Sequence, residues 1–186
     1  VLRARQGVGN IVARPLRVLT AEGTDVPADG ESLGELAVSG NDVMLGYYRD
    51  ADATEAVTLD GCLLTGDLAV MHPDGYVEIR DRRKDIIVSG GENIASVEVE
   101  RVLDRHPGVV ESAVVGVPHE FWGEVPVAFV AVRPGVRLSA EDLVAFAREH
   151  LSGYKVPKTV HFTELPKTST GKIQKHRLRE LARSGD

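Results

Sequence analysis

The sequence predicts an α+β fold built in two unequal pieces. Residues 1–82 contain short apolar runs separated by turn residues, a pattern typical of strands. Residues 83–186 alternate apolar runs with amphipathic ones, which is typical of a small layered domain of strands and helices. A chain of 186 residues buries roughly 70% of the surface that its unfolded form exposes, so we expect a substantial core.

Strands joined by turns are expected in the first piece. The clearest signal is a hairpin in which strands at residues 68–71 and 76–80 are joined through His72-Pro73-Asp74-Gly75, because Pro, Asp and Gly favour tight turns. Two further strands are predicted at residues 11–19 and 34–38.

The second piece is expected to contain two amphipathic helices around two buried strands. Ser96 is expected to cap the first helix, which His106-Pro107-Gly108 ends. Ser139, three residues before Asp142, is expected to cap the second. Residues 112–117 and 125–132 are apolar at nearly every position, which predicts strands covered on both faces.

Composition excludes several classes of protein. No stretch approaches the roughly 18 uninterrupted apolar residues of a membrane span, so we expect a soluble chain. The net charge of −6 argues against a nucleic-acid partner. The single Cys62 cannot form an intramolecular disulfide, and the first residues resemble no signal peptide, so a cytoplasmic location is expected.

The end of the chain is basic, in contrast to the whole. Its last 21 residues contain Lys and Arg at positions 167, 172, 175, 177, 179 and 183. This charge suits a polyanionic small molecule, and a solvated helix face explains it equally well.

Two segments near the boundary have both a plain and a functional interpretation. The run Arg80-Asp81-Arg82-Arg83-Lys84-Asp85 is a solvated connector, and a connector between two cores is also where a hinge lies. Thr65-Gly66-Asp67 alone indicates only a turn. An ionised Asp67, however, offers two acceptor oxygens to the two hydroxyls of a ribose.

Two glycine-containing segments lie farther along the chain. Ser89-Gly90-Gly91 is expected to form a strand-to-helix turn that needs positive φ, and a backbone without Cβ also allows close approach of a ligand. The sequence Pro-Lys-Thr-Ser-Thr-Gly-Lys at residues 166–172 is typical of a mobile surface loop, a property that also suits a loop closing on a reaction.

Together these segments resemble the C-terminal part of the adenylate-forming superfamily, which contains acyl-CoA synthetases, luciferases and the adenylation domains of peptide synthetases. The resemblance includes Gly46-Tyr47, Thr54, Asp60-Gly61-Cys62, Thr65-Gly66-Asp67, the segment from Arg82 to Ile94, and residues 166–172. Cys62 departs from the aromatic residue that is usual in the family. Gly-Gly-Glu-Asn-Ile at residues 90–94 is the form found in acyl-CoA synthetases and luciferases.

The resemblance implies a role for particular residues of this chain. Lys172 is implied as the catalytic lysine that bridges the oxygens of the carboxylate and the α-phosphate during adenylation, and Lys84 as the hinge. Asp67 and Arg82 are implied to bind the nucleotide. Contact with CoA is implied for four residues: Gly90, Gly91, Trp122 and Lys158.

The resemblance further implies a β-barrel part of a large N-terminal domain over residues 1–82 and a mobile α+β lid over 83–186. The expected activity is an ATP-dependent, AMP-forming acyl-CoA (fatty-acid-CoA) synthetase whose small-molecule partners are ATP or AMP, a carboxylic acid and CoA. Mg²⁺ is expected with ATP on ligands outside this chain, and no metal site is expected within it.

Two alternatives remain at this point. The chain fits an adenylation domain that loads a carrier protein, and it also fits a noncatalytic interaction module. Residues 1–60 contain no Gly-, Ser- and Thr-rich loop with a lysine that would hold the β- and γ-phosphates. The chain is therefore expected to be inactive alone and to need the missing N-terminal domain of the same enzyme.

Overall fold

The computed structural model describes residues 5–7 and 14–184 as two compact units, which comprise Val1–Lys84 and Asp85–Asp186. Both units contain strands and helices, and the expected α+β class is confirmed. No helix in the described part of the chain is long and apolar enough to cross a membrane.

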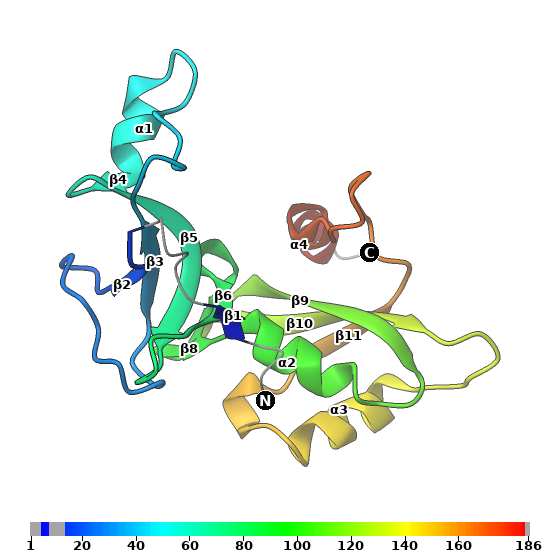
Figure 1. Ribbon diagram of the computed structural model, residues 1–186. Coiled ribbons are helices and arrows are strands. Elements are labelled where there is room, and N and C mark those ends of the chain that lie inside the picture. Colours follow the sequence, from blue (N-terminus) through cyan, green and yellow to red (C-terminus); the bar gives the residue numbers. More distant parts are fainter. Residues whose placement is uncertain (1–4, 8–13, 185–186) are drawn as a thin grey trace. The chain divides into compact units, whose positions relative to one another are not determined.

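The first unit is a sheet whose paired strands are all antiparallel (Figure 1). Its strand order is β1-β6-β5-β3-β2, with β4 paired to β5. The sheet consists of β1 (Arg5–Gly7), β2 (Arg17–Leu19), β3 (Gly34–Val38), β4 (Thr58–Leu59), β5 (Cys62–Met71) and β6 (Val77–Arg82). The short helix α1 (Ala51–Ala56) lies between β3 and β4 along the chain.

Local turn chemistry in this unit agrees with the sequence prediction. β5 and β6 form the expected hairpin: Met71 pairs with Val77, and the Gly75 amide donates to the His72 carbonyl at 2.9 Å. β3 spans its expected residues, whereas β2 is shorter than predicted. Residues 11–13 of the strand predicted at 11–19 lie outside the described residues.

Thr65-Gly66-Asp67 lies inside β5, at an irregularity of the sheet, and does not follow the strand as a turn. The pairing of β3 with β5 shifts between Glu35 and Ala37, and Gly66 has φ +75°. Glycine adopts this left-handed conformation at little cost, so the bulge that precedes Asp67 forms without backbone strain.

The second unit has three layers (Figure 1). Its sheet has the order β11-β10-β7-β8, with β9 also paired to β10. One face packs on helices α2 and α3 through Val114, Val130 and Leu143, and the other face packs on α4 through Val115, Phe129 and Leu178. The strands are β7 (Ile87–Ser89), β8 (Glu92–Ile94), β9 (Val109–His119), β10 (Gly123–Val132) and β11 (Thr159–Phe162). The helices are α2 (Ser96–Leu103), α3 (Ala140–Arg148) and α4 (Lys175–Ser184).

The two predicted buried strands are confirmed by this layering. β9 and β10 each contain a run of consecutive buried residues, because successive side chains enter opposite cores. Their pairing is antiparallel and extends along nearly their whole length.

One predicted helix cap is confirmed and the other is wrong. Ser139 caps α3, and its hydroxyl accepts a hydrogen bond from the Asp142 amide at 3.1 Å. The N-cap of α2 is Ala95, and the fully buried Ser96 hydroxyl accepts instead from the Lys175 ammonium at 2.7 Å. A partner 79 residues away therefore takes the hydroxyl that local capping would have used.

Candidate functional site

In the first unit, the two residues predicted to bind nucleotide are paired. Asp67 and Arg82 lie opposite each other in the β5–β6 register, and Arg82 Nε is 2.6 Å from Asp67 Oδ1. The Asp67 side chain is 19% exposed and that of Arg82 is 53% exposed. A partly exposed carboxylate and guanidinium on two neighbouring strands can accept from hydroxyls and donate to a phosphate.

Glu35 of β3 organises this region, although sequence reasoning did not identify it. Its Oε1 accepts from the Gly66 amide at 3.0 Å and its Oε2 from Arg83 Nη1 at 3.0 Å. One carboxylate thus connects the bulge before Asp67 to the residue after Arg82. The partners of Glu35 lie 31 and 48 residues away along the chain, so no local sequence pattern predicts these contacts.

A cavity of about 510 Å³ lies beside this group. Its lining includes Glu35, Gly66, Arg82 and the predicted hinge residue Lys84. Of the predicted site residues, Arg82 and Lys84 therefore line one hollow, and Asp67 is connected to it through its ion pair with Arg82.

In the second unit, Gly90, Gly91 and Trp122 lie close together. Gly90 and Gly91 form the tight turn between β7 and β8 with φ values of +60° and +86°, so the expected strand-to-helix turn is a strand-to-strand turn. The Gly90 amide donates to the Trp122 carbonyl at 2.8 Å, and a Cβ on Gly90 would lie 2.9 Å from Trp122 Cε3. A Cβ on Gly91 would meet nothing within 4 Å, so Gly91 is the more open of the two glycines.

Two polar side chains hold this turn region in place. Glu124 accepts from the Val88 amide at 3.1 Å, which ties β7 to β10. His119 Nδ1 accepts from the Phe121 amide at 3.1 Å and the Trp122 amide at 3.3 Å. Trp122 remains 45% exposed, so its ring can be reached from solvent.

Lys158 lies on the same side of β10 as the glycine turn. Its amide donates to the Pro126 carbonyl at 2.9 Å, just before β11 pairs with β10. Pro126 is three residues after Gly123, which is the residue that pairs with β7, so Lys158 lies about 10 Å farther along the strand. Its side chain is exposed.

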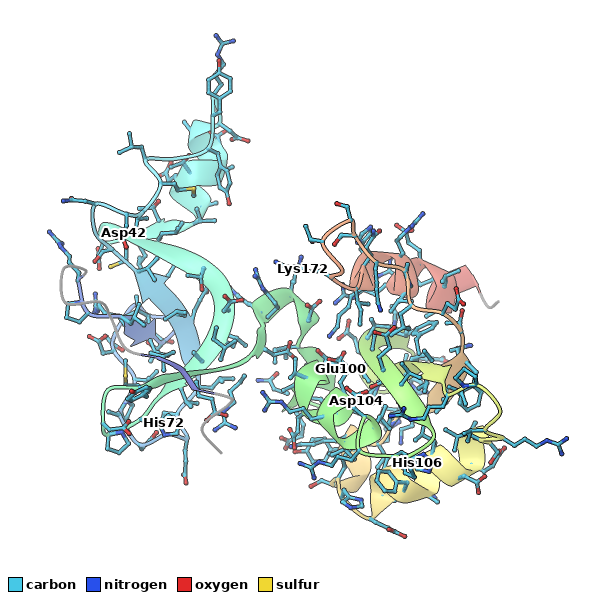
Figure 2. All side chains as sticks on the ribbon, turned by 45° about the vertical axis from the view of Figure 1, so that its right-hand side comes forward. Asp42, His72, Glu100, Asp104, His106 and Lys172 are labelled. Atoms are coloured by element: carbon cyan, nitrogen blue, oxygen red, sulfur yellow. The ribbon has the colours of Figure 1, made fainter. Side chains whose placement is uncertain are left out.

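Lys172 is the last residue of a tightly closed loop that precedes α4 (Figure 2). The Thr168 amide donates to the Lys172 carbonyl at 2.8 Å, and Thr168 Oγ1 accepts from the Lys172 amide at 3.1 Å. Gly171 has φ +83°, which this turn requires. Lys172 is exposed, and the structure shows no ion pair or hydrogen bond to its ammonium from the described residues.

Three other basic residues near the chain end form ion pairs within the second unit. Lys167 pairs with Glu111, Lys175 with Glu100 and Arg179 with Asp85. Among the described residues, no cluster of His, Cys, Asp and Glu is arranged to hold a metal ion. Two of these ion pairs attach α4 to the rest of the unit, and Lys172 differs from all three paired residues in presenting its charge to solvent.

Residues 98–172 match the family described as the AMP-binding enzyme C-terminal domain. The second unit is therefore similar to the C-terminal domain of AMP-binding enzymes, and the match ends at Lys172.

Similar proteins cover nearly the whole chain. It is 51% identical to 2-methylpropanoate--CoA ligase CCL4 of Humulus lupulus, over 98% of this chain and 34% of the relative. It is 45% identical to the peroxisomal trans-cinnamate:CoA ligase of Petunia hybrida, over 98% of this chain and 32% of the relative. The chain thus spans about a third of the length of these curated relatives.

Among solved structures, ATP-bound MatB from Rhodopseudomonas palustris is 34% identical and superposes with a TM-score of 0.91, over 97% of this chain and 36% of MatB. Apo MatB, with the same coverage, gives a TM-score of 0.68. The two MatB structures therefore differ in shape over the region that this chain matches.

Proposed function

We propose that the chain forms part of an ATP-dependent, AMP-forming acid–thiol ligase. In the first half-reaction a carboxylate oxygen attacks the α-phosphorus of ATP and pyrophosphate leaves, which gives an acyl-adenylate. In the second, the sulfur of CoA attacks the acyl carbonyl and AMP leaves. Named CoA ligases among the relatives and the ATP-bound MatB structure support this proposal.

The state of Lys172 is the observation that carries the proposal. An exposed ammonium on a closed loop is free to meet the negative charge that develops on the carboxylate and the α-phosphate oxygens. Its near neighbours in sequence, Lys167 and Lys175, are instead paired with glutamates. Lys172 is therefore our candidate for the catalytic group of adenylation.

The nucleotide is assigned to Asp67 and Arg82, whose pairing leaves acceptor and donor capacity beside the cavity of the first unit. Asp67 would accept from the ribose hydroxyls, and Arg82 would approach the ribose and phosphate. Mg²⁺ would arrive with ATP on ligands outside this chain.

CoA is assigned to the second unit. Gly90 and Gly91 would let the narrow thiol-bearing arm pass close to the backbone, and Trp122 would stack on the adenine. Lys158 would pair with a phosphate as a flexible cation. The exposure of Trp122 and the open space beside Gly91 support this assignment.

Lys84 is proposed as the pivot about which residues 83–186 turn between the two half-reactions. The chain divides into its two compact units directly after this residue, and few contacts oppose a change of dihedral angle at such a connection. The two shapes of MatB support a movement of this kind.

The test is a screen of carboxylic acids with the full-length enzyme that contains this chain, measuring pyrophosphate release with and without CoA. We expect ATP-dependent pyrophosphate release with at least one acid, and AMP and acyl-CoA in equal amounts when CoA is present. Absence of pyrophosphate with every acid, beside tight binding to another protein, would favour an interaction module. Cytoplasmic location is part of the proposal, and imaging of the tagged full-length protein distinguishes it from the peroxisome named for the Petunia relative.

A further inference from the structure

The loop that carries Lys172 is closed at its base by the residues on either side of it. Lys167 and Ile173 form an antiparallel bridge. The Gln174 amide donates to the Pro166 carbonyl at 2.8 Å, and Gln174 Nε2 donates to the Lys167 carbonyl at 2.8 Å. The position of Lys172 therefore depends on how this base is attached to the rest of the second unit.

At the C-terminal end of the loop, where the chain enters α4, the base is attached through Lys175, the first residue of that helix. Its Nζ lies 2.7 Å from Glu100 Oε1 and 2.7 Å from the buried Ser96 hydroxyl, both on α2. Glu100 Oε1 also accepts from the Val114 amide of β9 at 2.7 Å. The Lys175 and Glu100 side chains are only 16% and 15% exposed, so we call Lys175, Glu100 and Ser96 the buried triad.

At the N-terminal end of the loop, the attachment of the base to the rest of the unit is weaker. Lys167 pairs with Glu111 at 2.7 Å, but their side chains are 42% and 31% exposed. Exposed pairs of this kind contribute about 0–1 kcal/mol and are screened by salt. The buried triad is therefore the stronger of the two attachments.

Anchoring of α4 alone does not require the buried triad. Leu178 of α4 is fully buried in the core formed with Phe129 and Val115, and Arg179 of α4 pairs with Asp85. Burying an ammonium and a carboxylate carries a desolvation cost that an apolar side chain of similar size avoids. The buried triad instead defines the position of the first residue of α4, since its hydrogen bonds hold that residue against both α2 and β9.

We propose that Lys175, held by Glu100 and Ser96, is a positioning residue for adenylation. It fixes the C-terminal end of the Lys172 loop so that the Lys172 ammonium reaches the reacting oxygens in a defined place. This inference rests on the proposed role of Lys172. None of the three residues of the buried triad is proposed to touch a substrate. Their proposed role is confined to one half-reaction, adenylation.

The experiment compares Lys175→Met with Lys155→Met in the full-length enzyme. Lys155 is a matched control because its Nζ pairs with Glu98, also on α2, at 2.7 Å, and its side chain is 19% exposed. Adenylation is followed by pyrophosphate release, and thioester formation by the reaction of CoA with preformed acyl-adenylate. Because misplacing a reacting group by about 1 Å costs on the order of 10²-fold in rate, we expect Lys175→Met to slow adenylation about 10- to 100-fold.

Thioester formation by Lys175→Met should stay within about threefold of wild type, since the assigned CoA residues lie elsewhere in the unit, and Lys155→Met should leave adenylation within the same margin. Lys175→Arg, which can still donate to Glu100, should recover much of the loss. Equal slowing of both half-reactions by Lys175→Met, or an adenylation loss no greater than that of Lys155→Met, would overturn the proposal. Glu100→Gln, which keeps an acceptor at Oε1, provides a second variant if Lys175→Met does not fold.

Hydrogen exchange on this chain separates failure of the proposal from failure of the proposed function. Lys175→Met should speed amide exchange at Gly171, Lys172 and Gln174, whether or not Lys172 is catalytic. Unchanged exchange at these amides would overturn the positioning role even if Lys172→Ala abolishes adenylation. Faster exchange together with an adenylation-selective loss in Lys175→Met would support it.

Discussion

The two glycines of the β7–β8 turn provide a matched pair for testing the assigned CoA region. Both have positive φ, so replacing either with alanine incurs a backbone cost of about 1–2 kcal/mol. Only Gly90→Ala adds a steric conflict, because its Cβ would lie 2.9 Å from Trp122 Cε3, whereas that of Gly91→Ala meets nothing within 4 Å. Trp122 is 45% exposed, so its ring can move away at an off-rotamer cost of about 0.5–1.5 kcal/mol.

We therefore expect Gly90→Ala to lower the free energy of unfolding by about 1.5–3.5 kcal/mol and Gly91→Ala by about 1–2 kcal/mol. Trp122 is the only tryptophan of the chain, so its emission reports the ring displacement directly. Denaturant unfolding followed by fluorescence and circular dichroism measures both quantities. In the full-length enzyme, Gly91→Ala should slow thioester formation and spare adenylation. Equal unfolding free energies, or an unchanged Trp122 emission in Gly90→Ala, would refute the reasoning from geometry.

Three further perturbations test other parts of the account. Asp67→Ala in the full-length enzyme should weaken AMP binding about tenfold or more, since a charged hydrogen bond contributes about 1.5–3 kcal/mol, and an unchanged Kd would exclude Asp67 from the site. Leu178→Ala should destabilise the second unit by about 2–5 kcal/mol, while the exposed Leu181→Ala changes little, as measured by denaturant unfolding. Hydrogen bonds from the Ser32 side chain and backbone lower the pKa of Asp29 from 3.8 to about 2, so its stabilising contribution is present above pH 3.8 and is lost as the pH falls towards 2. Ser32→Ala should raise this pKa in a carboxyl NMR titration.

Features set by local chemistry could be predicted from the sequence. The turn at residues 72–75 forms because Pro, Asp and Gly favour it regardless of what packs nearby. Ser139 caps α3 because the acceptor and the Asp142 amide are three residues apart. The consecutive apolar residues of β9 and β10 predicted coverage of both faces, which the helices on either side provide.

Features set by distant partners could not be predicted in this way. Ser96 has the sequence context of a cap, but the Lys175 ammonium reaches its hydroxyl from the other end of the unit. Glu35 has no distinguishing neighbours in sequence, and its importance follows only from its bonds to Gly66 and Arg83. In both cases the role of the residue depends on a tertiary contact, which neither composition nor periodicity predicts.

The assigned site residues divide in the same manner. Lys172, Asp67 and the paired glycines were proposed from family motifs, whereas the side chains that hold their surroundings, such as Glu124 and His119, were found only in the structure. Motifs identify groups that meet a substrate, and packing identifies groups that position them.

We proposed above that the Lys172 ammonium serves adenylation and not thioester formation. The most direct measurement is therefore the rate of each half-reaction in Lys172→Ala, made in the full-length enzyme with preformed acyl-adenylate supplied for the second. We expect adenylation to fall on the order of 10²- to 10³-fold, while thioester formation stays within about threefold of wild type. Equal loss of both half-reactions, or no loss of adenylation, would contradict it.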